Sequence, residues 1–174
     1  MDKKDSESLI ASLKNYLTLL ETPRTEYEGL PTCPFIKKER LNNNLMIGIF
    51  NPEKESFLEK METFVNSNFT DAVFAQQIDE KLSTEDSKTY QNFLNKLLRE
   101  HYQNYKVIIT NPSDNFFVKD YNPRSHAPCF LIVVTDRKKL AKAHKQMMNS
   151  KYFTNFGDDY LKYLNVKRED LNLK

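Results

Sequence analysis

Two patterns of hydrophobic residues alternate along the chain. In some stretches apolar residues recur every three or four positions, which is typical of amphipathic helices, and in others they form short continuous runs, which are typical of buried strands. Together with start and stop signals such as Pro23 and Pro34, the first pattern predicts helices over residues 7–21, 34–41, 52–67, 84–104, 136–149 and 158–165. The second pattern predicts strands over residues 45–50, 72–75, 105–110 and 129–134.

The alternation of helices with strands predicts an α/β fold, with an α+β arrangement as the alternative. We expect a single small mixed sheet of about four strands packed with helices. Residues 1–174 should form a single domain, in which the charged residues 1–7 fray. The runs 45–50 and 129–134 lack a polar face, so they are expected to be the central strands. The sequence leaves the order and direction of the strands open.

Composition narrows the classes of protein and of site. Hydrophobic residues make up 39% of the 174 residues and aromatic residues 12%, which is enough for a packed core and excludes wholesale disorder. The formal net charge of +2 does not favour general binding to nucleic acid. The 3 Gly of the chain are too few for a glycine-rich phosphate loop of the Rossmann or P-loop type, and we expect no cofactor.

Signals for export and for membrane insertion are not recognisable in the sequence. No apolar run approaches the roughly 20 residues of a membrane-spanning helix, so no membrane partner is expected. The charged start of the chain is unlike a secretory signal, and two cysteines, Cys33 and Cys129, do not make a disulfide scaffold. We therefore expect a cytoplasmic protein with reduced cysteines and leave its oligomeric state open.

Cys33 is the candidate catalytic residue because of the residues that follow it. Pro34 is favoured in the first turn of a helix, which would place the thiol beside unpaired backbone N–H groups and the positive end of the helix dipole. Lys37, Lys38 and Arg40 come next, and nearby cations lower the pKa of a thiol. This arrangement predicts a reactive thiolate with Lys37 and Arg40 as binding residues. The alternative is a small buried cysteine under the first helix, with the lysines in solvent.

The long segment 111–127 joins two predicted strands and carries the second candidate site. Arg124, with Ser125 and the neighbouring backbone N–H groups, could bind a carboxylate or a phosphate. Asn122 and His126 are grouped with them as binding candidates, and His126 is the local candidate for a general base. The alternative for Arg124 is an ordinary surface salt bridge.

A metal site is a weaker hypothesis for the same segment. His126 and Cys129 have a His-x-x-Cys spacing, so with Asp120 or Cys33 they could bind a transition metal. The paired cysteines or histidines that usually mark zinc sites are absent from the sequence. We therefore assign no metal ligands.

Cys33 and Arg124 each stand in a short motif. The first reads Thr32-Cys33-Pro34-Phe35, and the second reads Tyr121-Asn122-Pro123-Arg124-Ser125-His126-Ala127-Pro128. The chain thereby resembles a widespread bacterial family of small proteins of unknown function, which has Cys-Pro-Phe near the start and Asn-Arg-Ser-Pro-x-Pro late in the chain. Here Pro123 is an insertion and His126 replaces a proline. The resemblance covers roughly residues 9–146 and implies a site without supplying an activity.

The Cys-Pro-Phe tripeptide is also similar to the active-site turn of omega-class glutathione transferases and related glutaredoxin-like folds. Those folds place a cis-proline directly before a strand, and Ala127-Pro128-Cys129 is similar to that feature. They also place a strand just before the cysteine, and residues 22–32 lack the pattern of one. Position 36 is not a cysteine, so a Cys-x-x-Cys dithiol is excluded.

One hypothesis joins these features: a cytoplasmic enzyme that depends on the Cys33 thiolate and acts on a small anionic substrate. Arg124 and Ser125 would bind the anion, and Cys33 and Arg124 would line one concavity. Two alternatives are kept. One is a non-catalytic binding or adaptor module that uses the same cleft or the basic helix 136–149, and the other is a glutathione-transferase-like or glutaredoxin-like thiol protein. The sequence does not identify a reaction, and whether the chain is an enzyme stays open.

Overall fold

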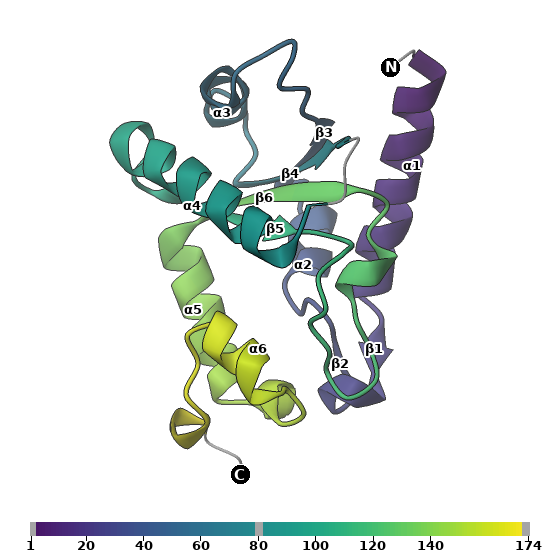
Figure 1. Ribbon diagram of the computed structural model, residues 1–174, viewed down its shortest axis with the longest axis vertical. Coiled ribbons are helices and arrows are strands. Elements are labelled where there is room, and N and C mark those ends of the chain that lie inside the picture. The colour runs from purple at the N-terminus through teal and green to yellow at the C-terminus, as the bar shows by residue number, and fades with distance from the viewer. Residues whose placement is uncertain (1–2, 79–81, 172–174) are drawn as a thin grey trace.

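A four-stranded sheet forms the centre of the computed structural model, which describes residues 3–78 and 82–171 (Figure 1). Its strands are β3 Leu45–Ile49, β4 Asp71–Gln76, β5 Tyr105–Thr110 and β6 Phe130–Asp136. They lie in the order β3-β4-β6-β5, with β3 parallel to β4 and the other neighbours antiparallel. The predicted mixed α/β sheet of four strands is therefore confirmed. A separate hairpin pairs β1 Pro23–Arg24 with β2 Leu30–Pro31.

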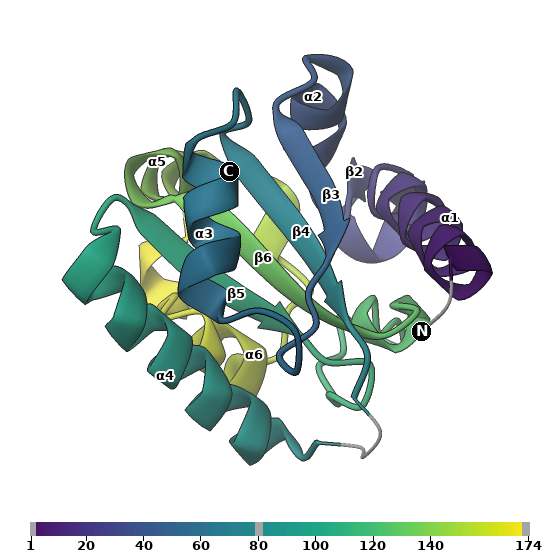
Figure 2. The same cartoon turned by 90° about the horizontal axis from the view of Figure 1, so that it is seen from above.

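Helices cover both faces of this sheet (Figures 1 and 2). They are α1 Lys3–Leu20, α2 Ile36–Leu41, α3 Phe57–Val65, α4 Thr84–His101, α5 Arg137–Met148 and α6 Asp158–Tyr163, with short 3-10 turns η1 Thr25–Tyr27, η2 Arg124–His126, η3 Lys151–Phe153 and η4 Arg168–Asp170. α3 and α4 lie on the first face, whereas α1, α5 and α6 lie on the second. Within the described residues, none of these helices combines the length and the hydrophobicity that crossing a membrane requires.

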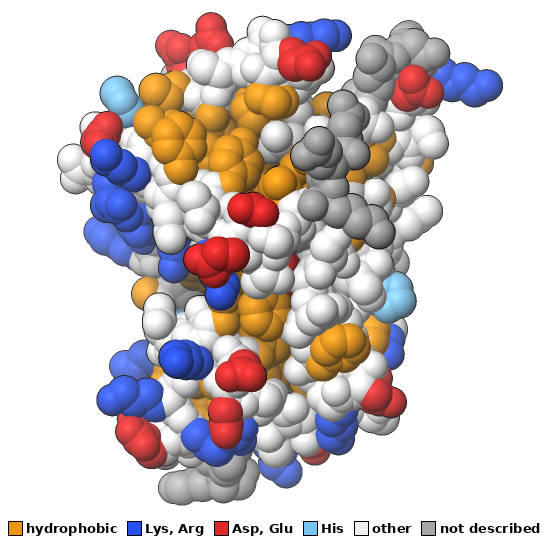
Figure 3. All heavy atoms as spheres, viewed as in Figure 1, with side chains coloured by type: hydrophobic (Ala, Val, Ile, Leu, Met, Phe, Trp, Pro, Cys, Tyr) orange, Lys and Arg blue, Asp and Glu red, His pale blue; other side chains and the backbone are white. Residues whose placement is uncertain are grey.

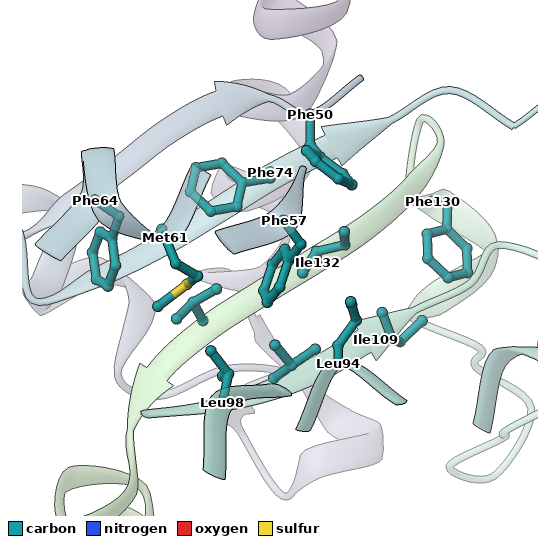
Figure 4. Close-up of a cluster of buried hydrophobic side chains, with 13 residues drawn as sticks. Phe50, Phe57, Met61, Phe64, Phe74, Leu94, Leu98, Ile109, Phe130 and Ile132 are labelled. Carbon is teal, nitrogen blue, oxygen red and sulfur yellow. The ribbon is translucent and has the colours of Figure 1, made fainter. Parts of the chain in front are cut away.

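The first face is packed through one large cluster of buried side chains (Figure 4). Met61 and Phe64 of α3 and Leu94 and Leu98 of α4 are almost fully buried, and they belong to the same cluster as Phe74 of β4. These helix residues recur at the predicted spacing of three or four positions, so each helix turns one apolar stripe to the sheet. Removing this apolar surface from water is the main favourable term in folding.

α3 begins at Phe57, five residues later than the sequence pattern predicts. Ser56 caps the helix: its hydroxyl accepts a hydrogen bond from the Glu59 backbone N–H (3.3 Å), and the Glu59 carboxylate accepts one from the Ser56 N–H (2.6 Å). Asn51 instead accepts a hydrogen bond from the Glu53 N–H (2.9 Å) in the preceding turn. The predicted start at residue 52 is therefore wrong, because the reciprocal capping box satisfies two backbone donors at the later position.

α1 packs its apolar stripe on the second face of the sheet. Leu13 and Leu17 are buried in a cluster with Val73 of β4 and Leu131 of β6. Contrary to the expected fraying of residues 1–7, the helix begins at Lys3, while residues 1–2 lie outside the described part of the chain. Packing against the sheet thus stabilises a helix whose first turn is charged.

The two central strands are β4 and β6, so the expectation for residues 129–134 is confirmed and that for residues 45–50 is wrong. Every residue of β4 is buried, whereas β3 is an edge strand whose residues after Leu45 keep partial exposure. The polar ends of β4 are compatible with this position because they are hydrogen-bonded. Asp71 accepts a bond from the Thr135 hydroxyl (2.6 Å), and Gln76 accepts one from the Tyr90 hydroxyl (3.3 Å).

Side-chain amides of α4 cover the other edge of the sheet. Asn95 donates a hydrogen bond to the Val107 carbonyl oxygen (2.9 Å) and accepts one from the Val107 N–H (3.0 Å). Gln91, one turn earlier, accepts a bond from the Ile109 N–H (2.7 Å). The outward-facing backbone groups of β5 therefore find partners that a further strand would otherwise supply.

Candidate functional site

Arg124, the predicted anion-binding residue, is buried in the loop between β5 and β6. Only 7% of its surface is exposed, and its guanidinium donates a hydrogen bond to the carboxylate of Asp114, which is 2% exposed. Asn122 supports the pair: its side chain accepts a bond from the Arg124 N–H (3.0 Å) and donates one to the Asp114 carbonyl oxygen (2.6 Å). An internal carboxylate therefore occupies the position that an external anion would need. The predicted anion-binding roles of Arg124 and Asn122 are corrected to structural ones.

Aromatic rings enclose the Arg124 guanidinium on the side of the C-terminal segment. Its Cζ atom lies 4.7 Å from the ring centroid of Phe116, 5.0 Å from that of Tyr163 and 5.9 Å from that of Tyr160. The Phe116 ring also stacks on Tyr160, with 5.0 Å between centroids. Cation–π contacts are stronger when the cation is removed from water, as Arg124 is here. Because Tyr160 and Tyr163 belong to α6, these contacts attach the loop to that helix.

The two residues after Arg124 lie on the surface. Ser125 donates its hydroxyl hydrogen bond to the carbonyl oxygen of Asn122 (2.8 Å), and the His126 ring stacks on Tyr121 with 5.5 Å between centroids. Both Ser125 and His126 are exposed, whereas Arg124 is enclosed. The predicted group is therefore not assembled into a single binding site.

Cys33 lies in the turn between β2 and α2 and not at the start of a helix. α2 begins at Ile36 and Phe35 is its N-cap, so Pro34 precedes the helix and its first turn. Although the residue as a whole is half-buried, burial of the thiol raises the pKa of Cys33, and the backbone N–H groups of Phe35 and Ile36 oppose this shift only in part. A raised pKa keeps the thiol protonated near neutral pH, which contradicts the predicted thiolate.

The predicted cationic neighbours of Cys33 serve another group. Arg40 donates two hydrogen bonds to the Glu21 carboxylate, at 2.7 and 2.9 Å. These bonds, with a smaller contribution from the charge of the exposed Lys37, hold the pKa of Glu21 below its usual range. Lys37 and Arg40 are therefore surface residues beside α1, and the role predicted for them at Cys33 is not supported.

Cys33 and Arg124 nevertheless both influence the pKa of one side chain, that of Tyr16 in α1. Burial raises the pKa of Tyr16, Arg124 acts in the opposite direction, and Cys33 acts in the same direction as burial. Neither Cys33 nor Arg124 lines the pocket described below.

Alkylation of Cys33 by iodoacetamide should be slow at pH 7 and should rise with a midpoint above the value of about 8.5 that is usual for free cysteine. The reason is that desolvation penalises the thiolate. Mass spectrometry of the modified peptides separates Cys33 from Cys129, and protein unfolded in guanidinium chloride is the control, in which the midpoint should return to about 8.5. A midpoint below that value in the folded protein would restore the thiolate hypothesis.

The hypothesised metal site does not form. In the part of the chain that the structure describes, no three His, Cys, Asp or Glu side chains are grouped closely enough to hold an ion. The Cys129 thiol donates to the carbonyl oxygen of Phe130 (3.4 Å), and burial raises the pKa of Cys129 to about 11. The His126 ring, as described above, stacks on an aromatic residue.

An open pocket of about 390 Å³ lies on the second face of the sheet, between β5, α5 and the C-terminal segment 151–165. Its volume falls in the range of roughly 300–1,000 Å³ that is usual for small-molecule sites. Aromatic side chains supply a large part of its wall: Tyr152, Phe153, Phe156, Tyr160 and Tyr163. Ile108 of β5 and Leu140 and Met147 of α5 add aliphatic surface. In Figure 3, hydrophobic side chains reach the surface in the lower half of the molecule, around α6.

The charge in this pocket comes from β5. Lys106 is the one lysine or arginine among the described residues that line it, and none of those residues carries a carboxylate. His144 lies beside it; burial and the charge of Lys106 lower the pKa of His144, so its ring is neutral near pH 7. The same ring makes an edge contact with Phe153, with 5.6 Å between centroids. The pocket therefore combines an aromatic wall with one positive charge.

Sequence reasoning missed this pocket because four separate segments build its wall: α4 through Gln91, β5, α5 and the C-terminal segment. One sequence feature could have indicated the pocket: residues 152–163 are rich in aromatic side chains and hold five of the 21 Phe and Tyr residues of the chain. The alternation along β5 was a second signal: Val107 and Ile109 face the α3–α4 cluster, so Lys106 and Ile108 point to the opposite face.

Comparison with family models, with curated proteins and with solved structures gives no match. The resemblance to the bacterial family with Cys-Pro-Phe and Asn-Arg-Ser-Pro-x-Pro motifs therefore stays a prediction.

The arrangement around Cys33 differs from that of glutathione transferases and glutaredoxin-like proteins at two points. Cys33 follows β2, a two-residue strand in a hairpin outside the four-stranded sheet. The peptide bond before Pro128 is trans, as are all peptide bonds in the described ranges. The structure thus does not support this alternative.

Proposed function

We propose that the chain is a non-catalytic binding module whose ligand is a small molecule held between β5, α5 and the segment 151–165. The observation that carries this proposal is the pocket of about 390 Å³, with its aromatic wall and single lysine. A concave, mostly apolar site with a few polar groups is the usual form of a small-molecule site.

The state of the cysteines favours binding over thiol catalysis. Burial raises the pKa of both Cys33 and Cys129, whereas a nucleophilic cysteine needs a lowered pKa. Arg124, the group assigned to the substrate anion, is occupied by Asp114. Among the alternatives drawn from the sequence, the binding module is therefore the one that these contacts support.

Filling the pocket provides the test. Leu140→Trp on α5 should weaken binding of 2-naphthamide and 2-naphthoate by about tenfold or more, because the indole takes the volume that the naphthalene ring needs. Binding is measured by calorimetry and by ligand-observed saturation-transfer NMR.

The matched control is Leu41→Trp, a substitution at a residue of α2 that is 63% exposed and lies outside the pocket. Circular dichroism and thermal unfolding show whether both variants fold. Since the chain has no native Trp, the emission of each new indole also reports whether a ligand reaches it. The proposal is wrong if the unaltered protein binds no naphthalene probe, or if folded Leu140→Trp binds them as well as Leu41→Trp does.

A further inference from the structure

The pocket contains an amine that no carboxylate neutralises. Lys106 lines it from β5, next to His144. Within residues 3–78 and 82–171, Lys106 takes part in no ion pair. Lys88 lies outside the pocket lining, 5.9 Å from the Tyr163 ring centroid, and it pairs with Glu85 at 3.8 Å. A half-buried lysine without a counter-ion favours binding of an anion.

The wall beside this amine is built from flat rings. Phe156 and Tyr160 stack with 5.0 Å between centroids and 21° between planes, and Tyr152 lies 5.3 Å from Phe156. Phe153 meets Phe156 edge-on at 5.1 Å. Aromatic rings that stack with an offset or meet edge to face stabilise each other by more than the burial of their surface alone provides. A planar aromatic ligand can extend this arrangement.

We propose that the ligand is an aromatic monocarboxylate, with its ring among the aromatic side chains of segment 152–163 and its carboxylate accepting a hydrogen bond from Lys106. This rests on the binding role proposed above and adds the chemical class of the ligand. One carboxylate matches one lysine, because His144 carries no charge near pH 7. A cationic ligand would instead meet Lys106 with like charge.

The outer face of α5 strengthens the case for an anion. Lys138, Lys142 and Lys145 are exposed at helical spacing, and residues 137–157 contain no Asp or Glu. Figure 3 shows Lys and Arg side chains gathered along the left-hand side of the molecule. Such a field raises the local concentration of small anions near the pocket.

The test compares three naphthalene probes that differ in charge: 2-naphthoate, 2-naphthamide and 2-naphthylmethylammonium. With the unaltered protein we expect the carboxylate to bind most tightly and the ammonium probe least tightly. Lys106→Gln should weaken binding of 2-naphthoate by about tenfold, as expected for the loss of a hydrogen bond to a charged group, and should leave 2-naphthamide within about twofold. The control is Lys96→Gln, an exposed position of α4 that makes the same change in net charge.

The outcomes separate this proposal from the one on which it depends. If all three probes bind equally and Lys106→Gln changes nothing, the ligand class is wrong while the binding role stands. If no probe binds the unaltered protein, the proposed binding role is wrong, and the proposed ligand class is wrong with it. If Lys96→Gln weakens 2-naphthoate as much as Lys106→Gln does, net charge and not the pocket lysine causes the effect, and the assignment of Lys106 is wrong. Thermal unfolding of each variant confirms that the comparison is made on folded protein.

Discussion

Replacing Asp114 by Ala should lower the free energy of unfolding by about 3–5 kcal/mol, the largest loss that we expect from a single substitution in this chain. The buried Arg124 guanidinium would keep its charge and lose the carboxylate that compensates it. The carboxylate is a better target than the arginine, because Arg124→Ala would also remove the contacts with three aromatic rings. The loss is measured by urea unfolding followed by circular dichroism.

Asp120→Ala is the matched control, since Asp120 is an exposed acid in the same loop, and it should change stability by less than about 0.5 kcal/mol. The double variant Asp114→Ala, Arg124→Met should recover part of the loss, because it removes the uncompensated charge while an aliphatic chain stays among the rings. Equal stability of Asp114→Ala and Asp120→Ala would show that the buried pair does not hold the loop.

Asn95→Leu should lower the free energy of unfolding by about 2–4 kcal/mol, although leucine is close to asparagine in size. The substitution removes the two hydrogen bonds to Val107 and leaves a buried N–H and a buried C=O without partners. Urea unfolding measures the loss, and amide hydrogen exchange at Val107 should become faster in the variant.

Asn92→Leu is the control for this second prediction, because Asn92 is an exposed residue of the same helix. Helix propensity changes in the same direction in both variants, so the difference between them isolates the contacts with β5. If the two variants unfold at the same urea concentration, the amides of α4 do not stabilise the edge of the sheet.

Local sequence patterns predicted the helices and strands well, but they predicted the positions of the strands within the sheet less well. Helices such as α4 and α5 were found because a 3.6-residue period depends only on which face is buried. The central position of β4 was missed because its polar ends, Asp71 and Gln76, mask a strand that is buried throughout. Burial there depends on tertiary packing: α3 and α4 cover one face of β4, and α1, far earlier in the sequence, covers the other. Hydrogen bonds from Thr135 and Tyr90 make the polar ends tolerable.

The candidate site shows the same limit more sharply. The sequence singled out Arg124, and the structure shows that it is a buried arginine paired with a carboxylate. Its partner, Asp114, lies ten residues away within an irregular loop. No periodicity relates two residues of such a loop, so the carboxylate could not be assigned. For Cys33, local charges predicted a low pKa, whereas burial, which depends on the tertiary structure, determined the direction of the shift.

Tyr160 and Tyr163 belong to two environments at once, since they line the pocket and also contact the Arg124 guanidinium. A ligand that needs both rings in place binds only the state in which the loop 111–127 is closed. Its binding therefore adds RT ln(1 + [L]/Kd) to the free energy of opening that loop. By the same linkage, a substitution that populates the open loop weakens binding by the factor by which it reduces the closed fraction. Occupancy of the pocket and hydrogen-exchange protection of the loop should therefore be thermodynamically linked, although Arg124 does not line the pocket.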